Sequence, residues 1–373
     1  MLGGIPIGKI FGISIKIHWS WFFIFGLITW NLAAGYFNQG DYESWSVGQR
    51  VLVGVIASIL FFSSVLAHEL AHSLVARREG IPIDSITLFI LGGVAHITEE
   101  PRRPGIEFRM AIAGPLCSAV LGVISLLAFW ATTGTSEPVA GTALFLGIAN
   151  IALAVFNLIP GFPLDGGRVL RSIIWWRSKN LRSATKTASI IGRAVGFGLI
   201  FIGIATVLAS QRWDGLWYAL VGWFLENAAA TSYRQLAIRD VLAGHKVSEL
   251  MYIDCPTTPP SITIEQLVQH YILNTGRRCF PVVHDSTVLG IVTMHDIKLI
   301  PRNRWATTTV GEVMTPLEKL KSVRPDDDLS YAMRIMTAGD INQLPVVEGG
   351  KVIGMVARDR LLDFIDTRAE LGT

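Results

Sequence analysis

Charged residues are scarce in this chain. Only 16% of its 373 residues are Asp, Glu, Lys or Arg, whereas 51% are hydrophobic, and the mean hydropathy is +0.46. Ordinary soluble domains carry about 25% charged residues, which excludes a wholly soluble enzyme. The scarcity is uneven, because long uncharged runs fill roughly the first 230 residues and the tail from about Ala237 mixes charged and apolar residues. We therefore expect a membrane part followed by a soluble part.

Cysteine is also rare, and no strong excess of one charge sign is present. The three cysteines, Cys117, Cys255 and Cys279, do not make a disulfide framework, so a reducing compartment is expected for the tail. The net charge of +3 does not indicate a nucleic-acid partner. The N-terminal residues lack a small-residue cleavage site after a compact apolar core, so no removable signal peptide is expected.

Six stretches approach the roughly 20 apolar residues that a membrane-spanning helix needs. They are residues 19–37, 51–76, 108–132, 142–159, 188–209 and 216–231. The connections between them alternate in charge, and basic residues such as Arg77, Arg78, Arg102 and Arg103 gather on one side. By the positive-inside rule that side is cytoplasmic. We expect a multi-pass protein of the cell membrane with both termini and the soluble tail in the cytoplasm.

Two further segments have the pattern of strands. IGKIFGISIKIHW, before the first span, alternates with period two and contains β-branched residues, which predicts a short hairpin at the membrane surface. Ile81 to Ile97 has a similar pattern. Open strands cannot face lipid, since their backbone groups would be unsatisfied. We expect these strands to be sheltered by the helices or to lie in the interface.

The second span contains a candidate metal site, HELAH, with His68, Glu69 and His72. On a helix, residues four apart share a face, so both imidazoles can bind one ion while Glu69 flanks the water position. In a soluble protein this pattern is more often a solvated helix face. Inside an apolar span, however, a charged side chain costs about 2.5 to 3.5 kcal/mol. A Zn²⁺ ion with an open coordination position would be a suitable partner.

A third ligand is offered by NLIPGFPLDGGRVL, in which Asn157 closes the fourth span and Asp165 follows two prolines. Pro160 and Pro163 end the helix, while Gly166 and Gly167 permit close backbone approach to the metal or the substrate. The alternative for Asp165 is an Asp-Gly turn that caps the next helix. Its position on the same side as the end of the second span favours metal binding. Nearby small residues, in GPLCSAVLG from Gly114, indicate close helix packing.

Together, HELAH and NLIPGFPLDGG resemble the motifs of the site-2 protease family, and the likeness covers nearly the whole chain. The resemblance implies an intramembrane zinc protease with His68, His72 and Asp165 as ligands and Glu69 as the catalytic base and acid. It also implies that Asn157 holds the substrate or the oxyanion. Finally, it implies that LFILGGVAHI, with Gly92 and Gly93, is an edge strand that pairs with an unwound substrate. A plain turn is the alternative for these two glycines.

The tail contains an internal repeat with a spacing of 63 or 64 residues. VSELM at Val247 corresponds to VGEVM at Val310, and VLGIV at Val288 corresponds to VIGMV at Val352. Each unit has the pattern strand, helix, strand, strand, helix, and the pair resembles tandem cystathionine β-synthase (CBS) domains. A repeat that serves only for dimerisation is the alternative.

The resemblance to CBS domains implies a regulatory nucleotide such as ATP, ADP or AMP. Thr293 and Asp296, just after VLGIV, match the Thr-x-x-Asp pattern that holds ribose and phosphate. The second repeat has Ala357 and Arg360 at the equivalent positions, so one nucleotide site is better supported than two.

The predicted fold is thus a membrane α-helical domain of about six spans with short β-strands, followed by an α/β CBS pair. Its expected limits are residues 1–235 for the protease domain, 236–245 for a linker, and 246–303 and 304–373 for the CBS domains. The implied substrate is a single-span membrane protein, such as a membrane-tethered transcription regulator, a pro-sigma factor or an anti-sigma factor. Homo-oligomers through the CBS domains are a further expectation. A CBS-regulated ion transporter or channel and a catalytically silent scaffold are the competing functions.

Overall fold

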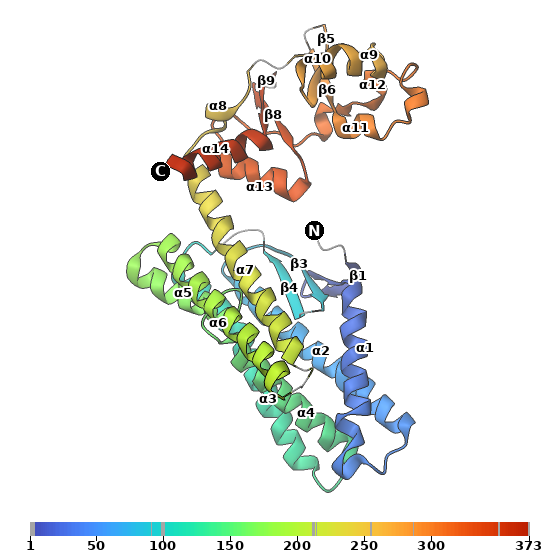
Figure 1. Ribbon diagram of the computed structural model, residues 1–373, viewed down its shortest axis with the longest axis vertical. Helices are drawn as coiled ribbons and strands as arrows, with labels where there is room; N and C mark the ends of the chain where they lie inside the picture. Colours follow the sequence, from blue (N-terminus) through green and yellow to red (C-terminus); the bar gives the residue numbers. More distant parts are fainter. Residues whose placement is uncertain are drawn as a thin grey trace. The chain divides into compact units, whose positions relative to one another are not determined.

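The structure, a computed structural model, divides the chain into two units, Met1–Leu236 and Ala237–Thr373 (Figure 1). It describes residues 4–90, 92–97, 101–210, 213, 215–253, 256–285, 287–349 and 351–371. Cys255 therefore lies outside the described residues. The two units are considered one at a time, and the domain limits given above stay predictions.

Long helices occupy the positions of all six predicted spans in the first unit. They are α1 (Trp19–Ala34), α2 (Val47–Arg78), α3 (Pro104–Thr132), α4 (Glu137–Asn157), α6 (Leu181–Ser210) and α7 (Gly215–Leu242), joined by the short helices η1 (Tyr36–Asn38), η2 (Gly40–Tyr42) and α5 (Asp165–Ser178). Within the described residues, α1 with η1, α2, α3, α4 and α6 are long and apolar enough to cross a membrane. A membrane-helical fold is confirmed, and the count of six spans stays a prediction because α7 does not meet this criterion.

Local sequence sets where these helices begin. Ser46 accepts a hydrogen bond from Gln49 N and Gln49 caps Ser46 in return, so α2 starts earlier than its apolar run. Pro104 occupies the first position of α3, where a missing N–H costs nothing. Large apolar side chains such as Trp30, Leu127 and Phe201 are exposed on the helices, as lipid contact requires.

The two segments predicted to form strands build one four-stranded sheet. Its strands are β1 (Ile5–Ile10), β2 (Ile13–Ile17), β3 (Ile83–Phe89) and β4 (Gly92–Ile97), in the order β1-β2-β3-β4. The outer pairs are antiparallel, and β2 runs parallel to β3. Ile13, Ile15 and Ile86 are buried in a cluster with Leu66 and Leu70 of α2. The sheet therefore packs on the helix that carries HELAH, and β4 forms its edge.

The helix α5 was not among the predicted spans, since its three arginines break any apolar run. A buried ion pair attaches it to α3: Arg171 donates from Nε to Glu107 Oε1 at 2.6 Å, and Glu107 is only 1% exposed. Breaking such a buried pair typically costs about 3 to 5 kcal/mol. This pair therefore fixes the helix that begins with Asp165.

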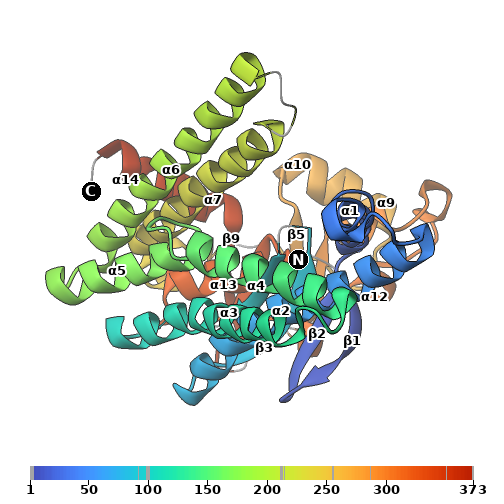
Figure 2. The ribbon, with the colours of Figure 1, turned by 90° about the horizontal axis from the view of Figure 1, so that it is seen from below.

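Two glycine contacts hold α6 against α7, which lie side by side in both Figure 1 and Figure 2. A Cβ added at Gly196 would lie 2.8 Å from Gly222 O, and one at Gly203 would lie 2.5 Å from Gly215 O. The absence of side chains at these positions lets the two backbones approach closely.

The second unit contains two similar halves, which confirms the α/β repeat. The first half comprises α8 (Val247–Leu250), α9 (Ile264–Gln266), η3 (Leu267–Ile272), α10 (Leu273–Thr275), β5 (Cys279–His284), β6 (Thr287–Thr293), α11 (Met294–Lys298) and η4 (Arg302–Arg304). The second comprises α12 (Val310–Val313), β7 (Thr315–Pro316), η5 (Leu317–Lys319), α13 (Leu329–Gly339), β8 (Gln343–Glu348), β9 (Lys351–Ala357) and α14 (Arg358–Leu371). Each half has an antiparallel hairpin with a bulge at equivalent valines, 282/283 and 346/347.

Candidate metal centre

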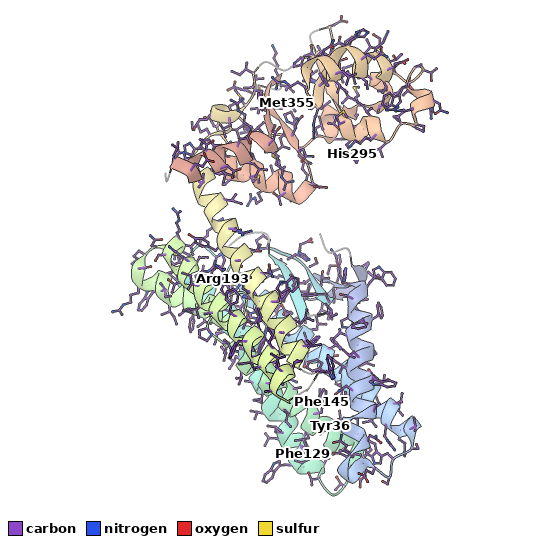
Figure 3. The ribbon with its side chains drawn as sticks, in the orientation of Figure 1. Tyr36, Phe129, Phe145, Arg193, His295 and Met355 are labelled. Carbon is purple, nitrogen blue, oxygen red and sulfur yellow. The ribbon has the colours of Figure 1, made fainter. Side chains whose placement is uncertain are left out.

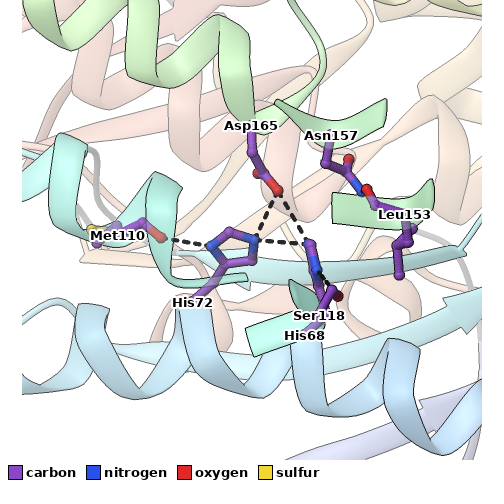
Figure 4. Close-up of polar contacts among 7 residues, drawn as sticks. All are labelled: His68, His72, Met110, Ser118, Leu153, Asn157 and Asp165. Atoms are coloured by element: carbon purple, nitrogen blue, oxygen red, sulfur yellow. Dashed lines mark hydrogen bonds and ion pairs between the residues drawn. The ribbon is translucent and has the colours of Figure 1, made fainter. Parts of the chain in front are cut away.

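Three side chains predicted as ligands meet at one point (Figure 4). His68 and His72 project from α2, and Asp165 projects from the first turn of α5. Asp165 Oδ2 lies 3.1 Å from His68 Nε2 and 3.0 Å from His72 Nε2, and the two Nε2 atoms are 3.2 Å apart. Leu164, rather than Asp165, is the N-cap residue of α5, and no side chain caps this end. The carboxylate is thus directed at the imidazoles instead of at its own helix.

The other nitrogen of each imidazole has a partner on α3. His72 Nδ1 donates to the carbonyl oxygen of Met110 at 2.6 Å, and His68 Nδ1 lies 2.9 Å from Ser118 Oγ. A carbonyl oxygen only accepts, so the His72 ring carries a proton on Nδ1, and Nε2 is the nitrogen that would bind a metal. Such contacts orient imidazoles that bind metals.

The dimensions of this cluster fit a zinc ion. Zn²⁺ binds nitrogen and oxygen ligands tetrahedrally at about 2.0 to 2.1 Å, which places neighbouring ligand atoms about 3.3 Å apart. The observed separations of 3.0 to 3.2 Å are close to that value. Two neutral imidazoles and one carboxylate are also a ligand set that catalytic zinc sites use, with the fourth position open.

Space for the cluster depends on Gly114 of α3. A Cβ at this position would lie 2.1 Å from His72 Nε2 and 2.6 Å from His68 Nε2, so any other residue would collide with both ligand atoms. Gly114 and Ser118 both belong to the segment that the sequence indicated only as helix packing. Their spacing of four residues, one turn apart on one face, is the signal that could have assigned them to the site.

Glu69 is close both to the candidate ligands and to the edge strand. It interacts electrostatically with His72, Asp165 and Arg168. A Cβ at Gly93 would lie 2.4 Å from Glu69 Cγ, so β4 passes directly against this side chain. Arg168, from α5, was not predicted to belong to the site.

Gly92 and Gly93 belong to β4 rather than to a turn, since they pair with Phe89 and Leu88 of β3. Gly92 has a φ of +130°, which L side chains rarely adopt. Gly92 is thus explained by its backbone conformation in the strand, and Gly93 by the close approach of the Glu69 side chain.

The loop that leads to Asp165 is held by close backbone contacts. A Cβ at Gly166 would lie 2.3 Å from Leu158 O, and one at Gly167 would lie 2.4 Å from Phe162 N. These glycines admit the chain's own preceding loop, and the close approach to the metal or the substrate stays a prediction. Asn157, the last residue of α4, donates from its side-chain amide to Leu153 O at 3.0 Å (Figure 4). It makes no hydrogen bond to the three ligands within the described residues.

Thr293 and Asp296 form a capping box at the start of α11. Thr293 Oγ1 donates to Asp296 Oδ2 at 2.7 Å, and Thr293 N donates to the same oxygen at 2.8 Å. In the second half, Arg360 lies over the ring of Tyr252, with its Cζ 4.5 Å from the ring centroid. The two halves therefore differ at the positions of Thr293 and Asp296, which are Ala357 and Arg360 in the second half.

Comparison with known proteins gives matches for both units. The profile of peptidase family M50 matches residues 56–142 and 134–203, and that of the CBS domain matches residues 247–301 and 310–367. Rip3 of Mycobacterium tuberculosis, whose name is that of a zinc metalloprotease, is 33% identical over 370 residues, which cover 98% of this chain and 94% of Rip3. A Synechocystis sp. protein, also named as a zinc metalloprotease, is 33% identical over 375 residues, 99% of this chain and 97% of its own.

Among solved structures, a site-2 protease from Methanocaldococcus jannaschii is 30% identical with a TM-score of 0.43, and the match covers 62% of this chain and 96% of that one. The relatives' one-third identity extends over almost the whole chain, so it includes the membrane helices and the repeat together. Their names and the nitrogen and oxygen ligands described above agree on Zn²⁺ as the cofactor. The chain therefore belongs to peptidase family M50: it is a multi-pass membrane zinc metalloprotease of the site-2 protease type, followed by a pair of CBS domains.

Proposed function

We propose that the zinc ion is held by His68, His72 and Asp165, and that the protein cuts peptide bonds within or near the transmembrane segments of membrane-tethered proteins. The observation that carries this proposal is that one ligand atom from each of the three residues lies within 4.8 Å of the others, and that the two histidines lie on α2, which is apolar enough to cross a membrane. Polar and ionisable side chains inside a membrane are energetically costly, so a cluster of three of them indicates a functional site such as a metal centre.

In the proposed reaction, a zinc ion held by His68, His72 and Asp165 would act as a Lewis acid toward the scissile carbonyl and would acidify the attacking water. Glu69 takes the proton from that water and passes it to the leaving amine. Its position beside Gly93 places the carboxylate next to the edge strand, where the scissile bond would lie. Arg168, which interacts electrostatically with Glu69, would help to hold the carboxylate in place.

A helical substrate must be extended before attack, because its peptide bonds are shielded by helix hydrogen bonds. We infer that the extended segment pairs with β4, whose only strand partner among the described residues is β3. Strand addition supplies backbone hydrogen bonds, and Gly92 and Gly93 allow the two backbones to approach. The side-chain amide of Asn157 would break its hydrogen bond to Leu153 O and donate to the substrate or to the oxyanion instead.

The substrate is proposed to be a single-span membrane protein, such as a membrane-tethered transcription regulator, a pro-sigma factor or an anti-sigma factor. The basic residues at the end of α2, Arg77 and Arg78, favour an active site near the cytoplasmic side with both termini and the CBS pair in the cytoplasm. An oligomer formed through the CBS domains is compatible with this arrangement.

Reconstitution of the full-length protein with a single-span substrate in proteoliposomes tests the function. We expect two fragments, cut inside or next to the span, that disappear when a zinc chelator is added and return with Zn²⁺. Mass spectrometry of the fragments locates the cut. Cleavage that persists without metal contradicts the zinc mechanism, and ion flux without any cleavage supports the transporter alternative.

We also propose that an adenine nucleotide binds near Thr293 and Asp296 and changes the cleavage rate. Replacing Asp296 by Asn keeps an oxygen that can accept from Thr293 N but removes the charge. Because hydrogen bonds to charged groups contribute about 1.5 to 3 kcal/mol, nucleotide affinity is expected to fall roughly 10- to 100-fold. Asp363→Asn, on the exposed face of α14, is the matched control.

Isothermal titration with ATP and AMP measures this affinity, and the proteoliposome assay measures its effect on cleavage. A ligand can shift such an equilibrium only by its different affinity for the two states. If millimolar ATP and AMP change neither cleavage nor thermal stability, the CBS pair is not a nucleotide sensor.

A further inference from the structure

A polar cavity of about 410 Å³ lies between α6 and α7. Its lining includes Lys186, Ser189 and Arg193 from α6, and Glu226, Tyr233 and Arg234 from α7. Figure 3 labels Arg193 on α6. All of these residues belong to the membrane unit, and none takes part in the metal centre.

Positive charge exceeds negative charge around this cavity. Arg193 Nε donates to Glu226 Oε1 at 2.8 Å, and its Cζ lies 6.0 Å from the ring centroid of Phe197. Lys186 and Arg234 have no hydrogen-bond or ion-pair partner among the described residues. Three cations and one carboxylate give an excess of two positive charges, which a phosphate group can neutralise with short, charge-assisted hydrogen bonds.

A buried hydroxyl in the lining has no partner. Ser189 is 2% exposed, and its Oγ makes no hydrogen bond to any described residue. Buried polar atoms are nearly always hydrogen-bonded, so an unpaired hydroxyl at a cavity wall indicates a ligand or an ordered water. Because this Oγ has almost no exposed surface, the Ser189 side chain would have to turn toward the cavity to donate to a phosphate oxygen.

An apolar stripe continues from the cavity along the outside of α6. Ile190, Phe197, Phe201 and Ile204 follow one another at spacings of three, four or seven residues, so they share a helix face with Arg193. Each is at least 50% exposed. A free phosphate ion cannot make apolar contacts with this stripe, whereas the acyl chains of a phospholipid would cover it.

We propose that the cavity between α6 and α7 binds the phosphate headgroup of an anionic phospholipid, whose acyl chains lie along this stripe. Basic pockets between membrane helices are suited to such headgroups. The binding does not depend on the proteolytic reaction. The orientation proposed above would place this site in the inner leaflet, and only that placement rests on the proposed function.

Binding can be measured with the full-length protein in nanodiscs of phosphatidylcholine, with or without phosphatidylglycerol, by native mass spectrometry of the retained lipid. Arg193→Gln and Lys186→Gln are each expected to weaken phosphatidylglycerol binding roughly fivefold. Arg177→Gln, which removes the same charge from an exposed position on α5, should change it less than about twofold. Arg193→Lys, which keeps the charge, should restore much of the binding.

Glu226→Gln provides the opposite test, because it removes the carboxylate that competes for Arg193. This variant is expected to retain more phosphatidylglycerol than the wild type, a gain that misfolding cannot produce. Equal binding by the wild type, Arg193→Gln and Glu226→Gln proteins would overturn the proposal. Displacement of the lipid by inorganic phosphate would also overturn it, since the site would then belong to a soluble anion.

Discussion

Replacement of Glu69 by Gln is expected to lower the cleavage rate roughly 10²- to 10⁴-fold while the protein still binds zinc. Glutamine has nearly the same shape, so it can occupy the space beside Gly93. It cannot take a proton from water, and the leaving amine would then lack its donor. The expected loss therefore lies in kcat, with little change in metal content.

The proteoliposome assay gives this rate, and elemental analysis of the same samples gives the zinc content per chain. Glu79→Gln is the matched control, because Glu79 caps the end of the same helix and pairs with Arg109 on the surface. That variant should keep nearly full activity. A Glu69→Gln protein that cleaves within tenfold of the wild type would remove Glu69 from the mechanism.

Substitution of Gly114 by Ala is expected to have a comparable effect through the metal itself. The added methyl group would lie 2.1 Å from His72 Nε2 and 2.6 Å from His68 Nε2, so at least one imidazole must turn away. Removal of a group that hydrogen-bonds to a metal-binding side chain typically weakens metal binding by about 10- to 100-fold. Displacement of the metal-binding imidazole itself should weaken it at least as much. Zinc affinity and cleavage should fall together.

Competition with a zinc chelator measures the affinity, and a thermal unfolding scan tests whether the variant is folded. Gly105→Ala is the control in the same helix, since a Cβ there meets no atom within 4 Å. Retention of stoichiometric zinc by Gly114→Ala, with an affinity like that of Gly105→Ala, would contradict the assigned ligand geometry.

The local parts of the site were predictable from sequence, because helix geometry alone puts residues four apart on one face. This is why His68 and His72 could be paired from the motif. The proximity of Asp165 could only be predicted from its side of the membrane and from family resemblance, since no spacing rule links two segments so far apart. Ser118 and Gly114 were missed because small residues in a membrane helix usually indicate only packing.

In the fold, too, the elements that depend on their own residues were predictable, whereas those that depend on contacts with distant residues were not. Alternation of apolar residues was enough to predict the strands, and apolar length was enough to place the helices. The short helix α5 depends instead on a contact from Glu107, which its own residues do not reveal. The contacts of Gly166 and Gly167 were not predicted for a similar reason, because their close neighbours lie in the preceding loop.

The hydrogen bond from His72 to Met110 has a consequence for how the catalytic centre can vary. Its acceptor is a main-chain carbonyl, so no exchange of the side chain at residue 110 removes it. The angle of the His72 ring is therefore set by the path of the α3 backbone, which contains Pro115 close by. If His72 binds the metal as proposed, any bend introduced there by a mutation or a drug would rotate its ring, so an inhibitor could act on the α3 backbone without contacting the metal.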